Sequence, residues 1–182
     1  ILGGIIGSDP TREMTPFLKL MQFKGFPAVI NFPSPGFAYG QHRRNLERNN
    51  YGVQQELKTL RTAKELGFYT FGLAYDEEIA MQIAADNHDA LVLGLAMLEW
   101  ENGGATLEQA AEYINRVSTK VKAVAPEMLI FVQGLPVQTP EDTQYIYDHT
   151  DAVGFIGINN MDYGTKPIQD TVAAFKSAKI HA

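Results

Sequence analysis

The sequence predicts an α/β protein built on a parallel β-sheet, and two observations lead to this fold class. Short apolar runs recur along the chain and carry Val, Ile, Leu or Phe at both alternating positions, which indicates strands buried on two faces. Between these runs, the apolar residues recur with the 3.6-residue period of helices. We therefore expect six strands alternating with helices, at residues 1–7, 27–32, 68–75, 90–96, 128–133 and 152–157.

Three apolar stripes define the helices that follow the first, second and fourth strands. Their spacing predicts that each stripe faces the core. The third helix is the longest, and Thr106 followed by Gln109 predicts a capping box at its start. The stripes are Phe17, Leu18 and Met21; Val53, Leu57, Leu60 and Ala63; and Leu107, Ala110, Ile114, Val117, Val121 and Val124.

The segment 133–142 predicts a strand that turns directly into a helix. Gly134 permits a tight turn and a close approach of the backbone to a ligand. Thr139 is a natural N-cap, and Pro140 suits the first helical position because the missing N–H has no partner there. Similar glycine and polar residues follow most of the predicted strands.

Length and composition indicate a single soluble domain spanning residues 1–182. The net charge of −6, with Lys and Arg spread along the chain, gives no reason to expect nucleic acid or a membrane as a partner. The absence of cysteine excludes disulfides and fits a cytoplasmic protein. Because Ile1 stands inside a predicted strand, we interpret the N-terminus as truncated or processed.

The strand ends favour a (β/α)8 barrel over an open doubly wound sheet. No G-x-G-x-x-G follows the first strand, and polar residues are instead spread over nearly all strand ends, as in barrels whose upper loops face one mouth. A closed barrel needs eight units, so about two would be missing. We therefore expect a homo-oligomer or a partner chain that covers the open sheet edge.

Four motifs give the chain a more specific resemblance: Gly7-Ser8-Asp9-Pro10, Asn31-Phe32-Pro33, Arg43 with Asn45-Leu46-Glu47, and Thr139-Pro140-Glu141-Asp142. Together they resemble the phosphoenolpyruvate hydrolase-like TIM-barrel family, also described as TIM-barrel signal-transduction proteins. The resemblance implies that the first segment is the third strand of a (β/α)8 barrel. It also implies chemistry on phosphoenolpyruvate or phosphonopyruvate, by hydrolysis or by a lyase reaction.

Residues after the first two strands are candidates for ligand or metal binding. Asp9 is a candidate catalytic residue and a candidate ligand for a divalent cation such as Mg²⁺, although a helix-capping role explains its position equally well. Ser8 and Asn31 are candidates for ligand binding. The Asn31 amide can hold a ligand oxygen or satisfy the backbone of its loop.

Charged residues further along the first half are also candidates. We place Arg43, Arg44 and Glu47 in a loop after the second strand, where the Arg43 guanidinium can clamp a carboxylate or phosphate and Glu47 can contribute to the site. An exposed loop with an internal Arg–Glu pair is the alternative. Glu77 is a candidate catalytic acid, although three acids at a helix start also suit the helix dipole.

The last two strands end in Gln133 and Gly134 and in Gly157, followed by Asn159, and we expect these four residues to bind a phosphate or carboxylate. Relative to the family pattern, Gln133 replaces a histidine. Glutamine cannot exchange a proton near neutral pH, so a general acid or base would be lost here. We expect His88 and His149 to be surface residues, and no spacing typical of a zinc site occurs.

Two functions remain open. The first is an enzyme that binds a small phosphorylated or 2-oxo carboxylate at the C-terminal ends of the strands. The second is a non-catalytic barrel domain that senses a metabolite, or acts as a scaffold, in a larger regulator or assembly.

Overall fold

A computed structural model describes residues 1–98, 104–157 and 165–180 of the chain. Six strands form one sheet in the order of the sequence, and the pairs β1–β2, β2–β3 and β5–β6 are parallel. Each strand falls within a predicted range, which confirms the α/β class and about six βα units. The strands are β1 (Leu2–Gly4), β2 (Ala28–Ile30), β3 (Tyr69–Ala74), β4 (Ala90–Gly94), β5 (Leu129–Gln133) and β6 (Gly154–Ile156).

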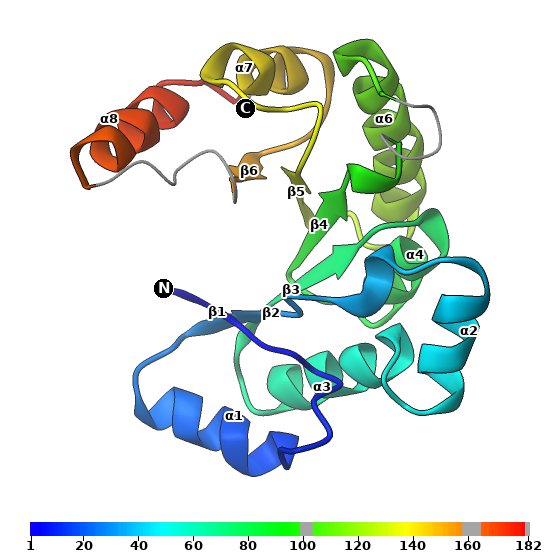
Figure 1. Ribbon diagram of the computed structural model, residues 1–182. Helices are drawn as coiled ribbons and strands as arrows, with labels where there is room; N and C mark the ends of the chain where they lie inside the picture. The colour runs from blue at the N-terminus through cyan, green and yellow to red at the C-terminus, as the bar shows by residue number, and fades with distance from the viewer. Residues whose placement is uncertain (99–103, 158–164, 181–182) are drawn as a thin grey trace. The chain divides into compact units, whose positions relative to one another are not determined.

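The chain divides into two compact units, Ile1–Leu91 and Val92–Ala182. In the first unit, α1 and α3 lie on the same side of β1 and β2 (Figure 1). The stripe predicted on α3 is buried along its whole length, and Leu18 and Met21 are buried on α1. The helical elements of this unit are α1 (Met14–Phe23), the 3₁₀ helix η1 (Pro35–Phe37), α2 (Gly40–Arg48), α3 (Val53–Glu65) and α4 (Glu77–Ala85).

The second unit contains α6 (Leu107–Val124), α7 (Pro140–His149) and α8 (Thr165–Lys176), with α7 between the other two helices (Figure 1). The capping box predicted at Thr106 is present, and Thr139 caps α7. Residues 110, 114, 117 and 121 of α6 are buried as predicted. The prediction is wrong for Val124, which is 52% exposed at the last position of the helix.

Helix α2 corrects the prediction of a loop after the second strand. Leu46 is the one apolar side chain among its nine residues, so the segment lacks the apolar stripe from which helices are predicted, and none of its residues is buried. Its polar side chains pair along the helix instead: Gln41 donates to Asn45 Oδ1 at 2.7 Å, and Arg44 donates to Gln41 Oε1 at 2.9 Å. Arg43 and Glu47 therefore lie on a helix.

The prediction that strands are buried on both faces holds for β4, whose five residues are all buried. It is wrong for β1, where Leu2 and Gly4 are exposed on either side of the buried Gly3. β1 stands at one end of the strand order and has β2 as its neighbour there, so fewer elements cover it.

His88 also corrects a prediction, since it is buried rather than on the surface, with 2% of its area exposed. Its Nδ1 lies 3.0 Å from Thr70 Oγ1, and the same hydroxyl donates to Asp89. Burial lowers the pKa of His88 to about 4, so the ring is neutral near pH 7. His149 is exposed, as predicted.

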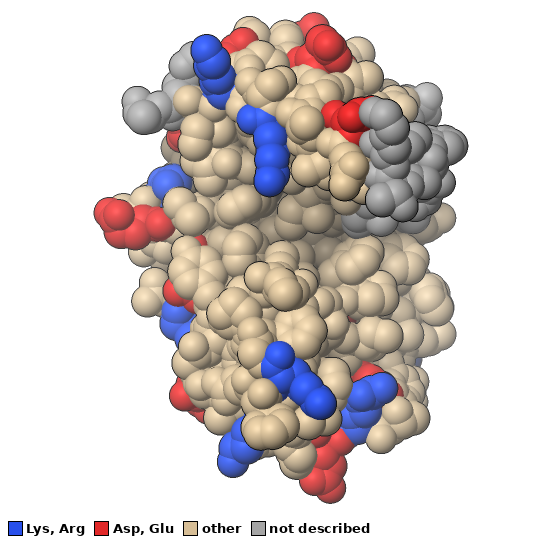
Figure 2. Space-filling view, turned by 90° about the vertical axis from the view of Figure 1, so that its left-hand side faces the viewer, with Lys and Arg blue, Asp and Glu red and all other residues tan. Residues whose placement is uncertain are grey.

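The surface carries both signs of charge. On the face shown in Figure 2, Lys and Arg side chains are interspersed with Asp and Glu, in a chain with 15 basic and 21 acidic residues. Among the described residues, none of the helices combines the length and the apolar character that crossing a bilayer requires.

Candidate functional site

A group of five polar side chains lies where β2 and β3 of the first unit end. We call Asn31, Ser34, Arg43, Glu56 and Asp76 the strand-end cluster. Asn31 and Ser34 follow β2, Asp76 follows β3, and α2 and α3 contribute Arg43 and Glu56. The cluster unites two residues that the sequence singled out, Asn31 and Arg43, with three that it did not.

Asn31 is completely buried and joins the ends of two strands. Its Oδ1 accepts from the backbone N–H of Leu73 at 2.7 Å, and its Nδ2 donates to the Leu73 carbonyl at 3.2 Å. The same Nδ2 lies 3.1 Å from Glu56 Oε2. The amide therefore extends the β2–β3 pairing and bonds to the backbone of β3, not to that of its own loop, and its role in ligand binding stays a prediction.

Glu56 is one of the three cluster residues that sequence reasoning missed, and it has no exposed surface. Its Oε2 accepts from Ser34 Oγ at 2.6 Å and from Asn31, whereas Oε1 has no hydrogen-bond partner in the described part of the chain. Burial raises the pKa of Glu56 to about 8, against the opposing effect of the two hydrogen bonds. The carboxyl group is therefore largely protonated near pH 7.

A signal for Glu56 does exist in the sequence. Val53, Glu56, Leu57 and Leu60 follow the i, i+3, i+4, i+7 spacing of one helix face, so the carboxyl stands within an apolar stripe. An acidic residue in such a stripe is rarely buried without a specific partner.

Arg43 reaches from α2 to the end of β3. Its Nη1 donates to Asp76 Oδ2 at 2.8 Å and to the Gly36 carbonyl at 3.4 Å, and about a quarter of its side chain is exposed. Arg43 thus pairs with Asp76 and not with a glutamate of its own segment, as the alternative of an internal Arg–Glu pair expected. No bond from Nε or Nη2 is recorded within the described residues, so that edge of the guanidinium is available to an anion.

Glu47 caps α3 from the preceding helix. Its Oε1 accepts from the backbone N–H of Val53 at 2.8 Å, and Oε2 accepts from that of Gln54 at 3.4 Å. The carboxylate packs so closely against Gly52 that a Cβ at that position would collide with it. Glu77, in the first turn of α4, is half-buried, and its N-cap neighbour Asp76 accepts from the Ile79 N–H at 2.8 Å.

Ser8 and Asp9 lie on the connection between β1 and α1, outside the strand-end cluster. The Asp9 carboxylate accepts from the backbone N–H and hydroxyl of Thr11 at 2.8 and 2.6 Å, and Arg12 Nε lies 3.0 Å from its other oxygen. These hydrogen bonds, mainly those of Thr11, lower the pKa of Asp9. The helix-capping alternative is wrong, because Glu13 holds the N-cap position of α1.

The divalent cation expected at Asp9 stays a prediction. Within residues 1–98, 104–157 and 165–180, no three His, Asp or Glu side chains converge. Asp9 already binds Thr11 and Arg12 through both carboxylate oxygens. No chemical step is therefore assigned to a metal at Asp9.

The second unit contains the remaining predicted residues. Gln133 ends β5, is largely buried, and its carbonyl accepts from the Leu95 N–H at 2.9 Å. Gly134 has a φ of +94°, which explains why glycine stands at this turn. Gly157 borders a mainly apolar cavity of about 560 Å³ that is also lined by Phe155 and Phe175. Asn159 lies outside the described residues.

The start of α7 is already occupied by a carboxylate of this chain. Asp142 Oδ2 accepts from the backbone N–H groups of Gln138 and Thr139 at 3.0 and 2.9 Å, and Thr139 Oγ1 accepts from the Asp142 N–H. A phosphate at this helix start would have to compete with Asp142. Arg43 is therefore better placed to bind an anion than the start of α7.

Parallel strands alternating with helices, and a polar cluster after β2 and β3, define an α/β protein of the TIM-barrel type. The model of the phosphoenolpyruvate hydrolase-like family matches residues 1–178, and the chain belongs to this family. The resemblance stated from the sequence motifs is thereby confirmed.

Curated relatives share the sequence over nearly the whole chain. It is 28% identical over 179 residues to the ToMV susceptible protein tm-1(GCR26) of Solanum lycopersicum, covering 96% of this chain and 24% of that protein. It is also 28% identical over 183 residues to the putative transcriptional regulatory protein y4pA of Sinorhizobium fredii, covering 96% and 30%. The chain thus spans about a quarter to a third of these relatives.

Solved structures share the fold. The flavin-binding domain of baker's yeast flavocytochrome b2 has a TM-score of 0.60 and 13% identity, with 97% of this chain and 48% of that chain covered. An O-GlcNAc hydrolase of Thermobaculum terrenum has a TM-score of 0.57 and 13% identity, with 97% and 45% covered. At this identity the likeness concerns the fold alone.

Proposed function

We propose that this chain binds a small phosphorylated or 2-oxo carboxylate at the C-terminal ends of its strands, with Arg43 as the residue that holds the anion. The observation that carries the proposal is the Nε and Nη2 edge of Arg43, for which the described residues supply no partner. Because Nη1 is fixed by Asp76 and Gly36, this edge is held in place before a ligand arrives.

The charge state of the strand-end cluster also favours an anion. Asp76 offsets one positive charge, but the raised pKa of Glu56 keeps a second negative charge out of the cluster near pH 7. A protonated carboxyl can also donate a hydrogen bond or a proton. With no exposed surface, the protonated Glu56 is placed to donate to neighbouring groups of the cluster and to hold it neutral around Arg43.

Phosphoenolpyruvate is the first ligand to test, because hydrolysis of its phosphate ester by one water yields pyruvate and phosphate. Thermal unfolding of the full chain would be measured with phosphoenolpyruvate, pyruvate and inorganic phosphate, each with and without Mg²⁺. Binding is expected to raise the unfolding temperature as ligand exceeds the Kd. Phosphate release from phosphoenolpyruvate measures turnover in the same samples.

The control for Arg43 lies next to it. Arg43→Ala is expected to weaken binding by about tenfold to a hundredfold, since hydrogen bonds to charged groups contribute about 1.5–3 kcal/mol. Arg44→Ala, which removes an exposed guanidinium bonded to Gln41, should leave binding unchanged. Equal ligand-induced shifts in both variants would contradict the assignment.

A second function is favoured by the names of the relatives. One is named a susceptible protein and another a putative transcriptional regulatory protein, and this chain corresponds to about a quarter to a third of each. We propose as the alternative a non-catalytic domain that senses a metabolite within a larger regulator. Stabilisation without phosphate release would favour sensing, whereas the absence of both effects would leave a scaffold role.

A further inference from the structure

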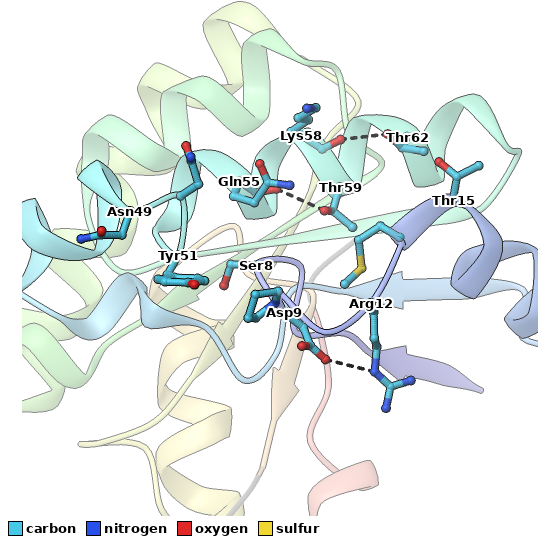
Figure 3. A pocket seen from close by; sticks show the side chains of 13 residues that line it. Ser8, Asp9, Arg12, Thr15, Asn49, Tyr51, Gln55, Lys58, Thr59 and Thr62 are labelled. Atoms are coloured by element: carbon cyan, nitrogen blue, oxygen red, sulfur yellow. Dashed lines mark hydrogen bonds and ion pairs between the residues drawn. The ribbon is translucent and has the colours of Figure 1, made fainter.

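A second cavity lies in the first unit, lined by residues outside the strand-end cluster. It has a volume of about 620 Å³, within the range of roughly 300–1,000 Å³ typical of small-molecule sites. Its walls are the β1–α1 connection, the segment between α2 and α3, and one side of α3 (Figure 3). Along α3, residues 55, 58, 59 and 62 line it, a stripe distinct from the one that carries Glu56.

Six polar side chains around this cavity have no recorded side-chain partner among the described residues: Ser8, Tyr51 and Gln55, and also Thr15, Asn50 and Lys58. Ser8 is 8% exposed, yet its hydroxyl makes no recorded hydrogen bond. The side-chain amide of Gln55 and the hydroxyl of Tyr51 are also without one. Figure 3 shows these three side chains around the same part of the cavity.

Neighbouring polar groups in the lining are satisfied within the protein. Thr59 Oγ1 donates to the Gly7 carbonyl at 2.7 Å, Thr62 Oγ1 donates to the Lys58 carbonyl at 3.1 Å, and Asn49 Nδ2 donates to the Asn45 carbonyl at 2.7 Å. The wall of the cavity thus combines polar groups that are bonded within the protein with polar groups that are not. The groups without a protein partner border the cavity, where water or a ligand can bond to them.

Apart from Lys58, whose ammonium points away from Ser8 and Asp9 in Figure 3, the charged residues of the lining pair with each other, which indicates a neutral ligand. Asp9 and Arg12 pair with each other at 3.0 Å, and in Figure 3 the Arg12 guanidinium points away from the side chains on α3. Most of the remaining lining consists of hydroxyl and amide groups, which both donate and accept hydrogen bonds, as sugar hydroxyls require. The Tyr51 ring, whose residue is 43% exposed, adds a flat apolar face.

We infer that this cavity is a binding site for a small neutral polyhydroxylated ligand such as a monosaccharide, contacted by Ser8, Tyr51 and Gln55. The inference is independent of the proposed anion site, because the two sets of residues share no member and the ligands differ in charge.

The test is ligand-observed NMR with the full chain and three neutral probes: D-glucose, D-ribose and myo-inositol, each at tens of millimolar. At least one probe is expected to bind. Ser8→Ala and Gln55→Ala should each weaken binding by about fivefold, and Tyr51→Ala should weaken it at least as much.

Two matched controls separate the site from general surface effects. Tyr69 is also 43% exposed, and Gln54 adjoins Gln55 on α3 but bonds to Gln82 instead, so Tyr69→Ala and Gln54→Ala should bind normally. The inference is overturned if none of the probes binds, if Tyr51→Ala binds as well as wild type, or if inorganic phosphate displaces the probe. Circular dichroism spectra would establish that each variant is folded.

Discussion

Glu56 is a carboxyl group in an environment that strongly disfavours its charged form. A carboxyl with no exposed surface sits on α3 with both recorded hydrogen bonds at one oxygen, and its pKa rises from an ordinary value of 4.5 to about 8. Sequence reasoning missed the residue because it weighed acidic residues only where they followed strands. Its position within an apolar helix stripe was the available signal.

The raised pKa of Glu56 predicts how stability depends on pH. Below about pH 4.5 the carboxyl is protonated in both the folded and the unfolded chain, so it does not change the free energy of unfolding. Between pH 4.5 and 8 the unfolded chain releases the proton while the folded chain keeps it. The free energy of unfolding should therefore fall across this window, by on the order of 5 kcal/mol from this residue, and level off above it.

Urea unfolding of wild type and Glu56→Gln between pH 4.5 and 9 measures this effect. The neutral amide removes the titration, so the variant should lose less stability than wild type as the pH rises. Glu65→Gln is the control, since it changes an exposed carboxylate on the same helix. Parallel curves for wild type and Glu56→Gln would show that burial does not disfavour the ionised form.

At the scale of elements, the helices with apolar stripes were predictable and α2 was not. Helix α3 buries Val53, Leu57, Leu60 and Ala63 on the face that the spacing indicated, and Thr106 and Thr139 cap their helices as expected. Helix α2 has a single apolar side chain, Leu46, so no apolar stripe marks it in the sequence. Polar pairs along the helix and the link from Glu47 to α3 become visible only in the structure.

Glu47 provides a prediction at this scale, because a cap and a ligand-binding residue respond differently to removal. Glu47→Ala should lower the free energy of unfolding by about 1 kcal/mol through loss of the bonds to Val53 and Gln54. The affinity for phosphoenolpyruvate should stay the same. Chemical unfolding and calorimetric titration of one preparation give both values, and a loss of affinity at unchanged stability would restore Glu47 as a ligand-binding residue.

At the scale of the whole molecule, the strand count and fold class followed from the sequence because buried parallel strands have a strong apolar signal. The family was predictable from ordered motifs such as Gly7-Ser8-Asp9-Pro10, and the family match over residues 1–178 confirms it. The local partners of the site residues were not predictable. Asp9 binds Thr11 and Arg12, and Asn31 binds Leu73 and Glu56, contacts that depend on the folded backbone.

The strand order also has a consequence for assembly. β1 and β6 stand at the two ends of the order, and an end strand presents backbone groups that another strand can bind. We predict that this chain associates with a second copy or another chain. Sedimentation velocity over a range of concentrations should show mass increasing with concentration, and a monomer at every concentration would contradict self-association.

The central claim is that the free edge of Arg43 binds an anionic ligand. Its most direct test is a crystal structure of the full chain grown with phosphoenolpyruvate. The account predicts a phosphate or carboxylate oxygen about 2.7–2.9 Å from Nε or Nη2 of Arg43, with Nη1 still on Asp76. A ligand bound elsewhere with Arg43 unoccupied, or crystals without bound ligand at saturating concentration, would contradict it.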